Sequence, residues 1–144
     1  MDDTQRFDPT RYRHWINEHV RFSDLDPLGH VNNNAMGEYF ENARAALFTI
    51  ITPRWPWRNQ IFVLARSSFD FRHELHLPAT FKIGTSVTEL GTTSLKLASA
   101  ILYENTGIAY CETVSVLIDQ STRRPTPLPD DLRQILQGFR EGNL

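Results

Sequence analysis

Residues 21–33 concentrate the side chains of this chain that are best suited to chemistry. The stretch reads RFSDLDPLGHVNN, and it holds two carboxylates, Asp24 and Asp26, close to the imidazole of His30. The proline, glycine and asparagines around them favour turns and helix caps. A carboxylate beside the free N–H groups at the start of a helix could serve acyl transfer, because the helix dipole favours negative charge there.

A purely structural role explains the same residues. Asp24 and Asp26 could accept turn and capping hydrogen bonds, with Pro27 and Gly29 setting the bend. A single histidine such as His30 is more often a hydrogen-bonded structural residue than a catalyst. Residue types and spacing alone therefore leave the function open.

The segments on either side predict a strand and a helix that would hold this stretch in place. Residues 16–22 alternate between polar and apolar side chains, as in a half-buried strand. Residues 35–50 predict one long helix, because apolar side chains recur there at three- and four-residue steps: Met36, Tyr39, Phe40, Ala43, Leu47 and Ile50. Gly37 inside this helix costs about 1 kcal/mol relative to alanine, which predicts close packing against it.

The remainder of the chain predicts a meander of antiparallel strands and a short final helix. The strands are expected at residues 61–76, 80–90, 94–104 and 107–120, and the helix at residues 130–137, ending near Gly138. This order predicts an α+β fold in which one helix covers one sheet. We expect residues 1–14 to form a flexible N-terminal segment and residues 15–144 to form a single domain.

Composition narrows the possible partners. The net charge is −2, with 15 basic and 17 acidic residues interspersed, which predicts no broad positive surface for nucleic acid. No apolar run is long enough to cross a bilayer, so we expect no membrane partner. The first residues are polar and do not resemble a secretory signal, and Cys111 is the only cysteine. A cytoplasmic protein without a disulfide is the expectation.

Several motifs in order resemble the hotdog-fold acyl-CoA thioesterases of the hydroxybenzoyl-CoA thioesterase type. The sequence FSDLD is followed by GHVNN and EYFENAR, and then by the weaker matches VLAR, GTTSL and RRPTPLP. The resemblance extends from about Glu18 to Leu132. It implies a hotdog fold, in which an antiparallel five-stranded sheet wraps a long central helix. It also implies a homodimer or homotetramer with edge-to-edge pairing, and hydrolysis of an acyl-CoA to a carboxylic acid and coenzyme A. No cofactor is implied, because coenzyme A is part of the substrate.

The resemblance also assigns residues to the reaction. Asp26 corresponds to the catalytic carboxylate of the family, and the main-chain amide of Asn33 corresponds to the group that polarises the thioester carbonyl. The expected substrate-binding residues are Gly29, His30, Val31, Asn32 and Arg66. Residues 34–37 depart from the family pattern, since Asn-Ala-Met-Gly stands where a run like Ala-Arg-Tyr-Leu is usual. The identity of the acyl group therefore stays open.

Other chemically capable residues receive a structural interpretation. Glu38 and Glu41 are expected to be solvated or to face a second subunit, although another branch of hotdog thioesterases uses a helix glutamate. Cys111 is interpreted as a buried structural residue. Basic side chains that could meet the phosphates of coenzyme A are Arg66, Arg72, Lys82, Lys96, Arg123 and Arg124.

No metal site is predicted. His73 and His76 lie within an expected strand, and residues three apart on a strand point to opposite faces.

Two other functions remain possible on the same fold. Hotdog hydratases use an aspartate and a histidine to add water to an enoyl thioester, but the spacing of Asp26 and His30 differs from their motif. The other possibility is a module that binds acyl-CoA without turning it over.

Overall fold

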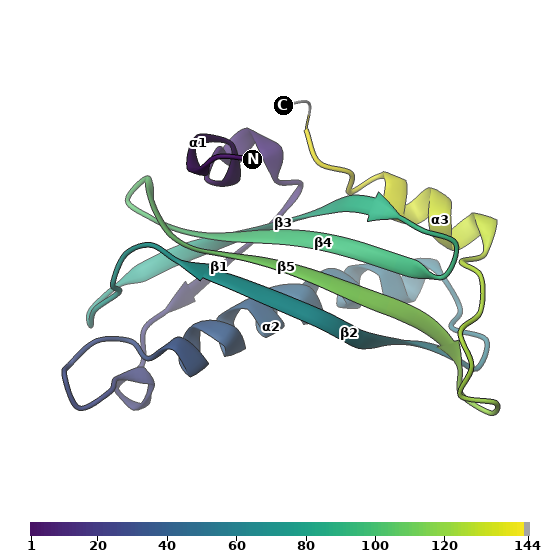
Figure 1. The fold of residues 1–144 in the computed structure, drawn as a ribbon, viewed down its shortest axis with the longest axis horizontal. Helices are drawn as coiled ribbons and strands as arrows, with labels where there is room; N and C mark the ends of the chain where they lie inside the picture. Colours follow the sequence, from purple (N-terminus) through teal and green to yellow (C-terminus); the bar gives the residue numbers. More distant parts are fainter. Residues whose placement is uncertain (143–144) are drawn as a thin grey trace.

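The apolar stripe of residues 35–50 forms one long helix. In the computed structural model, which describes residues 1–142, helix α2 (Asn33–Ile51) lies across one face of a single sheet (Figure 1). The side chains of Met36, Phe40, Ala43 and Leu47 follow the three- and four-residue steps and are buried. The predicted long helix is therefore confirmed.

The sheet is antiparallel throughout and has the order β1-β3-β4-β5-β2. Its strands are β1 (His14–His19), β2 (Gln60–Phe71), β3 (Thr80–Leu90), β4 (Ser94–Tyr103) and β5 (Thr106–Asp119). The last three agree with the predicted meander to within about one residue at each end. Together with α2 they confirm the α+β hotdog architecture.

The first strand is shorter than its sequence pattern predicts. The expected strand at residues 16–22 begins at His14 and ends at His19, and Phe22–Asp24 form a 3-10 turn, η2. The carboxylate of Asp24 accepts a hydrogen bond from the backbone N–H of Arg21 at 2.9 Å, which closes this turn. The side chain of Phe22 is left 82% exposed, although its alternation with Val20 predicted a shared buried face.

The second strand also ends early. Residues 61–76 were expected to be extended, but β2 stops at Phe71. Beyond it the N–H groups of Arg72 and His73 both donate to the carbonyl of Ile108, at 2.9 and 3.2 Å. One carbonyl that receives two successive donors interrupts the ladder, so the chain leaves the sheet there.

Two details of the helix differ from the sequence prediction. Ile51, not Ile50, continues the buried stripe: Ile51 is fully buried and Ile50 is 42% exposed. The expected close packing against Gly37 is wrong, because a Cβ atom built there meets nothing within 4 Å. Gly37 instead borders an open hollow beside the edge strand β2.

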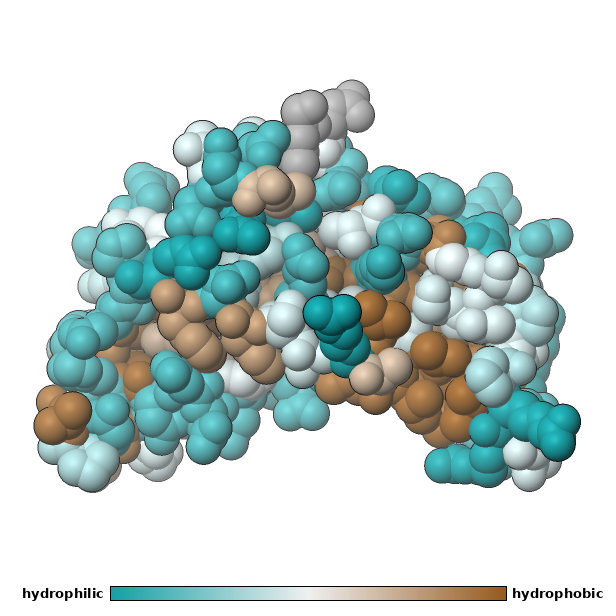
Figure 2. Space-filling view, in the orientation of Figure 1, coloured by the Kyte–Doolittle hydropathy of each residue, from teal (hydrophilic) through white to brown (hydrophobic). Residues whose placement is uncertain are grey.

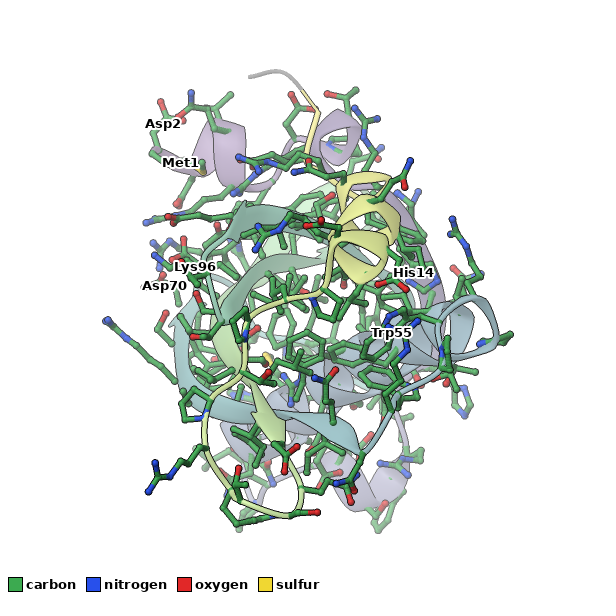
Figure 3. All side chains as sticks on the ribbon, turned by 90° about the vertical axis from the view of Figure 1, so that its right-hand side faces the viewer. Met1, Asp2, His14, Trp55, Asp70 and Lys96 are labelled. Carbon is green, nitrogen blue, oxygen red and sulfur yellow. The ribbon has the colours of Figure 1, made fainter. Side chains whose placement is uncertain are left out.

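The core continues to the far end of α2. Figure 3 shows side chains filling the space between α2 and the sheet, with Trp55 at the end that faces the viewer. Trp55 is 1% exposed, and its indole N–H donates to Asp131 at the start of α3 (Asp130–Gln137) at 3.1 Å. The predicted final helix is confirmed, and Leu132 and Leu136 bury its inner face.

The first residues of the chain pack against the other face of the sheet. They form a short helix α1 (Asp3–Arg6) and a 3-10 turn η1 (Pro9–Arg11). Arg11 and Tyr12 are buried, and Arg11 donates to Glu141 and to the hydroxyl of Tyr110, at 2.7 and 2.9 Å. The segment 1–14 was expected to be flexible, but some of its residues contribute to packing. The aromatic rings of Phe7 and Tyr12 pack with Tyr110 and with the small residues Ala98 and Ala100 of β4. Within residues 1–142, no helix has the length and apolarity to cross a membrane.

The two neighbouring isoleucines provide a test of the helix register. We predict that Ile51→Ala lowers the free energy of unfolding by about 3 kcal/mol, because it leaves a cavity in the core. The matched change Ile50→Ala should cost less than about 1 kcal/mol, since that side chain is partly solvated. Chemical denaturation of both variants measures the difference, and equal losses would contradict the observed register.

Candidate active site

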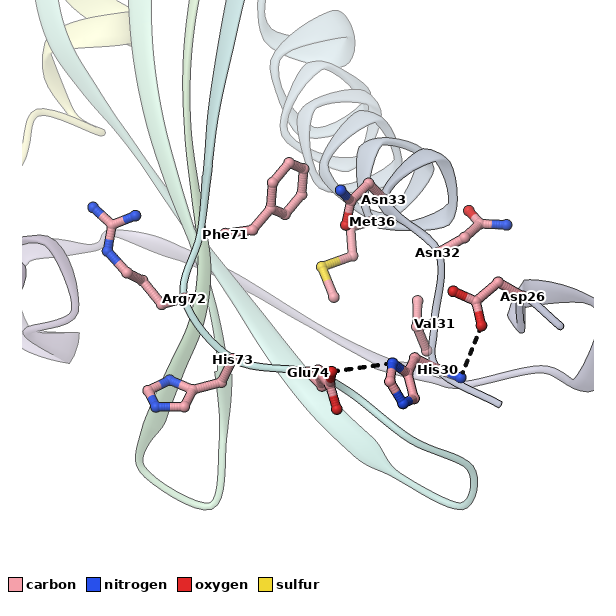
Figure 4. Close-up of a pocket in the computed structure, with 10 residues that line it drawn as sticks. All are labelled: Asp26, His30, Val31, Asn32, Asn33, Met36, Phe71, Arg72, His73 and Glu74. Carbon is pink, nitrogen blue, oxygen red and sulfur yellow. Dashed lines mark hydrogen bonds and ion pairs between the residues drawn. The ribbon is translucent and has the colours of Figure 1, made fainter. Parts of the chain in front are cut away.

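A cavity of about 370 Å³ opens where the loop before α2 meets the segment that follows β2 (Figure 4). Five of the seven predicted site residues line it: Asp26, His30, Val31, Asn32 and Asn33. The other lining residues are Met36, Phe71, Arg72, His73 and Glu74. Two segments far apart in sequence therefore form one concave surface.

Asp26 organises the loop on one side of the cavity. Its Oδ1 atom accepts hydrogen bonds from the backbone N–H groups of Leu28 and His30, at 2.9 and 3.2 Å. Its own N–H donates to the carbonyl of His30 at 2.8 Å. Gly29, with φ +85°, adopts the left-handed backbone that this tight loop requires. The turn-forming role and the catalytic role proposed for Asp26 are therefore compatible.

The second carboxylate oxygen of Asp26 is free for another partner. Among residues 1–142, no hydrogen bond to Oδ2 is found, and in Figure 4 this oxygen lies on the side that faces Met36. Two backbone donors on Oδ1 fix the orientation of the carboxylate without occupying the whole group. Such a fixed, half-satisfied carboxylate can act as a nucleophile or as a base.

Asp24 anchors the loop to the helix. Its buried carboxylate accepts hydrogen bonds from the Tyr39 hydroxyl at 2.5 Å and from the Arg21 guanidinium at 3.0 Å. Burial opposes ionisation, but these donors and the backbone N–H of Arg21 outweigh it and lower the pKa of the Asp24 carboxyl. Its carbonyl also accepts from the N–H of Asn32 at 3.0 Å. Asp24 thus determines where α2 begins.

The start of α2 supplies hydrogen-bond donors to the cavity. Asn32 is the N-cap, and its side chain accepts from the N–H of Ala35 at 2.7 Å. Asn33 follows as the first helical residue, and in the described chain its N–H has no protein acceptor. An unpaired N–H at the positive end of a 19-residue helix is suited to bind a negatively charged oxygen.

The opposite wall was not foreseen from the sequence. Glu74 reaches across the cavity mouth, and its carboxylate lies 3.1 Å from Nδ1 of His30 and 3.4 Å from Nε2 of His76. The expected geometry for His73 and His76 assumed a strand through both, but β2 ends before them. Phe71, at the end of that strand, contributes an apolar surface opposite Met36. No local pattern indicated this pairing, because it depends on the position at which β2 leaves the sheet.

The other candidate residues lie elsewhere. Arg66 does not line this cavity; it lies with Lys96 and Glu112 in a separate hollow of about 130 Å³. Of the six basic candidates for phosphate binding, only Arg72 lines the larger cavity, and its guanidinium binds Asp3 at 2.7 Å.

Glu38 and Glu41 are exposed and border the hollow beside Gly37. Cys111 is buried in the core, and this burial raises the pKa of its thiol to about 12.

A buried carboxylate at position 24 predicts pH-dependent stability. At pH 7, Asp24→Asn should lower the free energy of unfolding by about 1.5–3 kcal/mol, through the loss of charge-assisted hydrogen bonds. Because folding lowers the pKa of Asp24, its contribution is present above the ordinary aspartate value of about 4 and is lost as the pH falls below it. The difference between wild type and variant should therefore shrink below about pH 4.

Denaturation curves between pH 3 and pH 7 measure this dependence. The control is Glu38→Gln, which removes an exposed carboxylate 3.6 Å from the same Arg21. A variant–wild-type difference that stays constant over this range would contradict the role assigned to Asp24.

Comparison with known families gives one match over most of the chain. Residues 20–136 match the family model described as the thioesterase-like superfamily. No curated protein matches the chain significantly.

Solved structures provide independent similarities. A thioesterase from Thermus thermophilus, complexed with coenzyme A and zinc, is 32% identical, with a TM-score of 0.80; the alignment covers 89% of this chain and 94% of that one. A predicted thioesterase from Bacillus stearothermophilus is 27% identical, with a TM-score of 0.81 and coverage of 88% and 96%. YbaW, a probable thioesterase from Escherichia coli, is 25% identical, with a TM-score of 0.76 and coverage of 88% and 98%.

Proposed function

The chain belongs to the thioesterase-like superfamily, and from this premise we propose that it hydrolyses acyl-CoA thioesters, with Asp26 as the catalytic carboxylate. The observation that carries the proposal is the position of Asp26 in a cavity that the first residue of α2 also lines. The resemblance of FSDLD and GHVNN to the hydroxybenzoyl-CoA thioesterase type supports the same assignment. The reaction yields a carboxylic acid and free coenzyme A.

Two routes are open to the Asp26 carboxylate. In the first, Oδ2 attacks the carbonyl carbon, the C–S bond breaks, and coenzyme A leaves as a thiolate; water then hydrolyses the mixed anhydride. In the second, the carboxylate takes a proton from a water molecule as that water attacks the same carbon; the C–S bond then breaks, and coenzyme A leaves as a thiolate. Both routes use the orientation that Leu28 and His30 impose on the carboxylate.

The N–H of Asn33 is proposed to stabilise the negative charge that develops on the carbonyl oxygen. A preorganised donor of this kind typically lowers the barrier by about 3–4 kcal/mol. Only the main chain takes part, so the identity of the side chain at position 33 has little influence on the step. The dipole of α2 acts in the same direction.

The acyl group is proposed to lie against the apolar side chains of Val31, Met36 and Phe71. Met36 belongs to the segment 34–37, which departs from the family pattern. The shape of this pocket is therefore proposed to differ from the pockets of other family members. Asn32, Gly29 and His30 hold the loop that borders the thioester. Arg66 remains the proposed contact for the phosphates of coenzyme A, in a hollow that it shares with Lys96.

A homodimer formed through β2 is proposed as the working state. β2 is an edge strand that pairs only with β5 in the described chain, so its other side offers unpaired backbone groups. Apolar side chains gather along this edge (Figure 2), among them Leu64, Phe69 and Phe71, each more than a third exposed. A second copy that pairs edge to edge would bind the unpaired backbone groups of β2 and cover its exposed apolar side chains.

Replacement of Asp26 tests the function itself. Wild type should release free thiol from a saturated acyl-CoA, and Asp26→Asn should reduce that rate at least about 100-fold while retaining ligand binding. The matched control is Glu38→Gln, which removes a helix carboxylate outside the cavity and should keep near-wild-type turnover. A panel of short, long and aromatic acyl-CoAs identifies the substrate class.

The same assay separates the alternatives. A hydratase would hydrate an enoyl-CoA and release no thiol from a saturated one. A module that only binds would show binding without turnover in either form. Either result, or equal rates in Asp26→Asn and wild type, would refute the proposal.

Proline substitution tests the backbone donor separately. Proline is tolerated at the first position of a helix, and Asn32 already has the extended backbone that must precede it, with φ −75° and ψ 158°. Asn33→Pro should therefore preserve the fold but remove the N–H, lowering kcat about 10²–10³-fold. Asn33→Ala keeps the N–H and should remain close to wild type. Similar kcat values for the two variants would exclude this amide from the reaction.

A further inference from the structure

Three side chains of types that can ligate a metal converge beside the cavity, from two segments of the chain. His30 comes from the loop before α2, and Glu74 and His76 come from the segment after β2. The Glu74 carboxylate lies between the two imidazoles, with one oxygen 3.1 Å from His30 and the other 3.4 Å from His76 (Figure 4 shows the first contact). The two rings are 5.0 Å apart between centroids. Within residues 1–142 this is the one group of three such side chains found.

We propose that His30, Glu74 and His76 form a binding site for a divalent transition-metal ion of the zinc type. Two imidazole nitrogens and one carboxylate oxygen form a donor set that suits zinc better than magnesium or calcium, which prefer oxygen ligands. Three protein ligands leave a fourth tetrahedral position open to water or another molecule. This proposal concerns binding and does not depend on the proposed hydrolysis.

The distances are compatible with one shared ion. With zinc–ligand bonds of about 2.0–2.2 Å, tetrahedral donors lie about 3.4 Å from one another. The donor atoms of the three residues already lie within 4.8 Å of each other. The side chains of Glu74 and His76 are 61% and 56% exposed, so small rotations can close the remaining gap without repacking the core.

Ion pairing alone gives this arrangement little stability. Exposed pairs of this kind contribute little to stability, because solvent screens them and the side chains lose freedom. A shared ion replaces two weak contacts with three directed bonds. It would also link the two walls of the cavity, since His30 belongs to the loop that Asp26 organises and Glu74 to the opposite segment.

His73 offers a matched control within the same segment. It is the residue before Glu74, but its side chain points away from His30 (Figure 4), and its Nδ1 lies 2.9 Å from the carbonyl of Gly107. Removing either His73 or His76 takes away one exposed histidine. Only the removal of His76 takes a ligand from the proposed site.

Calorimetric titration of the purified protein with zinc chloride tests the proposal. Wild type and His73→Ala should bind one zinc ion per chain with similar affinity, and magnesium chloride should give no comparable signal. His76→Ala should weaken zinc binding on the order of 100-fold, since loss even of groups that support metal ligands weakens affinity 10–100-fold. Glu74→Gln should weaken it as well, and circular dichroism checks that each variant is folded.

A second measurement reports coordination instead of affinity. Cobalt(II) should give the visible absorption of a tetrahedral site with wild type and with His73→Ala, but not with His76→Ala. Absence of stoichiometric zinc binding by wild type would overturn the proposal. Equal zinc affinity in the His73→Ala and His76→Ala variants would also overturn it, because it would indicate nonspecific binding to surface histidines.

Discussion

The buried carboxylate of Asp24 and the hydrogen bonds that it accepts hold the loop of the candidate site against α2. Asp24 joins three parts of the chain. Its carboxylate binds Arg21, just before the 3-10 turn η2, and Tyr39 in the core of α2, and its backbone carbonyl binds the N–H of Asn32, the N-cap of α2. A buried carboxylate is tolerated only where donors compensate for its loss of water. Because those donors come from α2 and from the turn itself, the loop has a defined position relative to the helix.

The loop can therefore be irregular and still hold the Asp26 carboxylate in a fixed place. Asp26 lies two residues beyond Asp24, and its carboxylate is oriented by the loop's own N–H groups. The helix that receives the loop is held by a core that extends from Met36 to Ile51. A rigid scaffold and a short, internally bonded loop are a common way to position catalytic residues. The two aspartates differ in burial, since Asp24 is enclosed and Asp26 lines a cavity.

Local patterns predicted the elements whose stabilising contacts repeat along the chain. The sequence predicted α2 from its apolar period, β3, β4 and β5 from their alternation, and α3 from the prolines before it. Strand ends were less predictable. The alternation of Val20 and Phe22 and the expected extended backbone of residues 72–76 indicated strands that reach further. Instead, one hydrogen bond to Asp24 closes a turn after β1, and two hydrogen bonds to the carbonyl of Ile108 interrupt the ladder after β2. The bond to Asp24 is local, but the bonds to Ile108 join residues whose proximity depends on the whole fold.

The candidate site also combines residues that local sequence predicted with residues whose position depends on the whole fold. Asp26, His30 and the helix start at Asn33 belong to one continuous stretch, so their proximity followed from sequence spacing. Glu74 and Phe71 come from a segment about forty residues later, and their approach depends on the register between β2 and β5. Arg66, expected from its guanidinium group to meet the phosphates of coenzyme A, lies outside the cavity within one chain. The buried positions of Arg11 and Tyr12 were also hidden, because a polar segment gives no periodic pattern that indicates burial.

The burial of Cys111 makes the folded protein unreactive toward thiol reagents. It is the only cysteine of the chain, it is 2% exposed, and its pKa near 12 leaves almost no thiolate at neutral pH. Thiol reagents such as Ellman's reagent would then detect free thiols in solution, such as released coenzyme A, and not the cysteine of the folded protein. Equally, one cysteine introduced on the surface would carry a fluorophore or spin label at that position alone, with the native residue left in place.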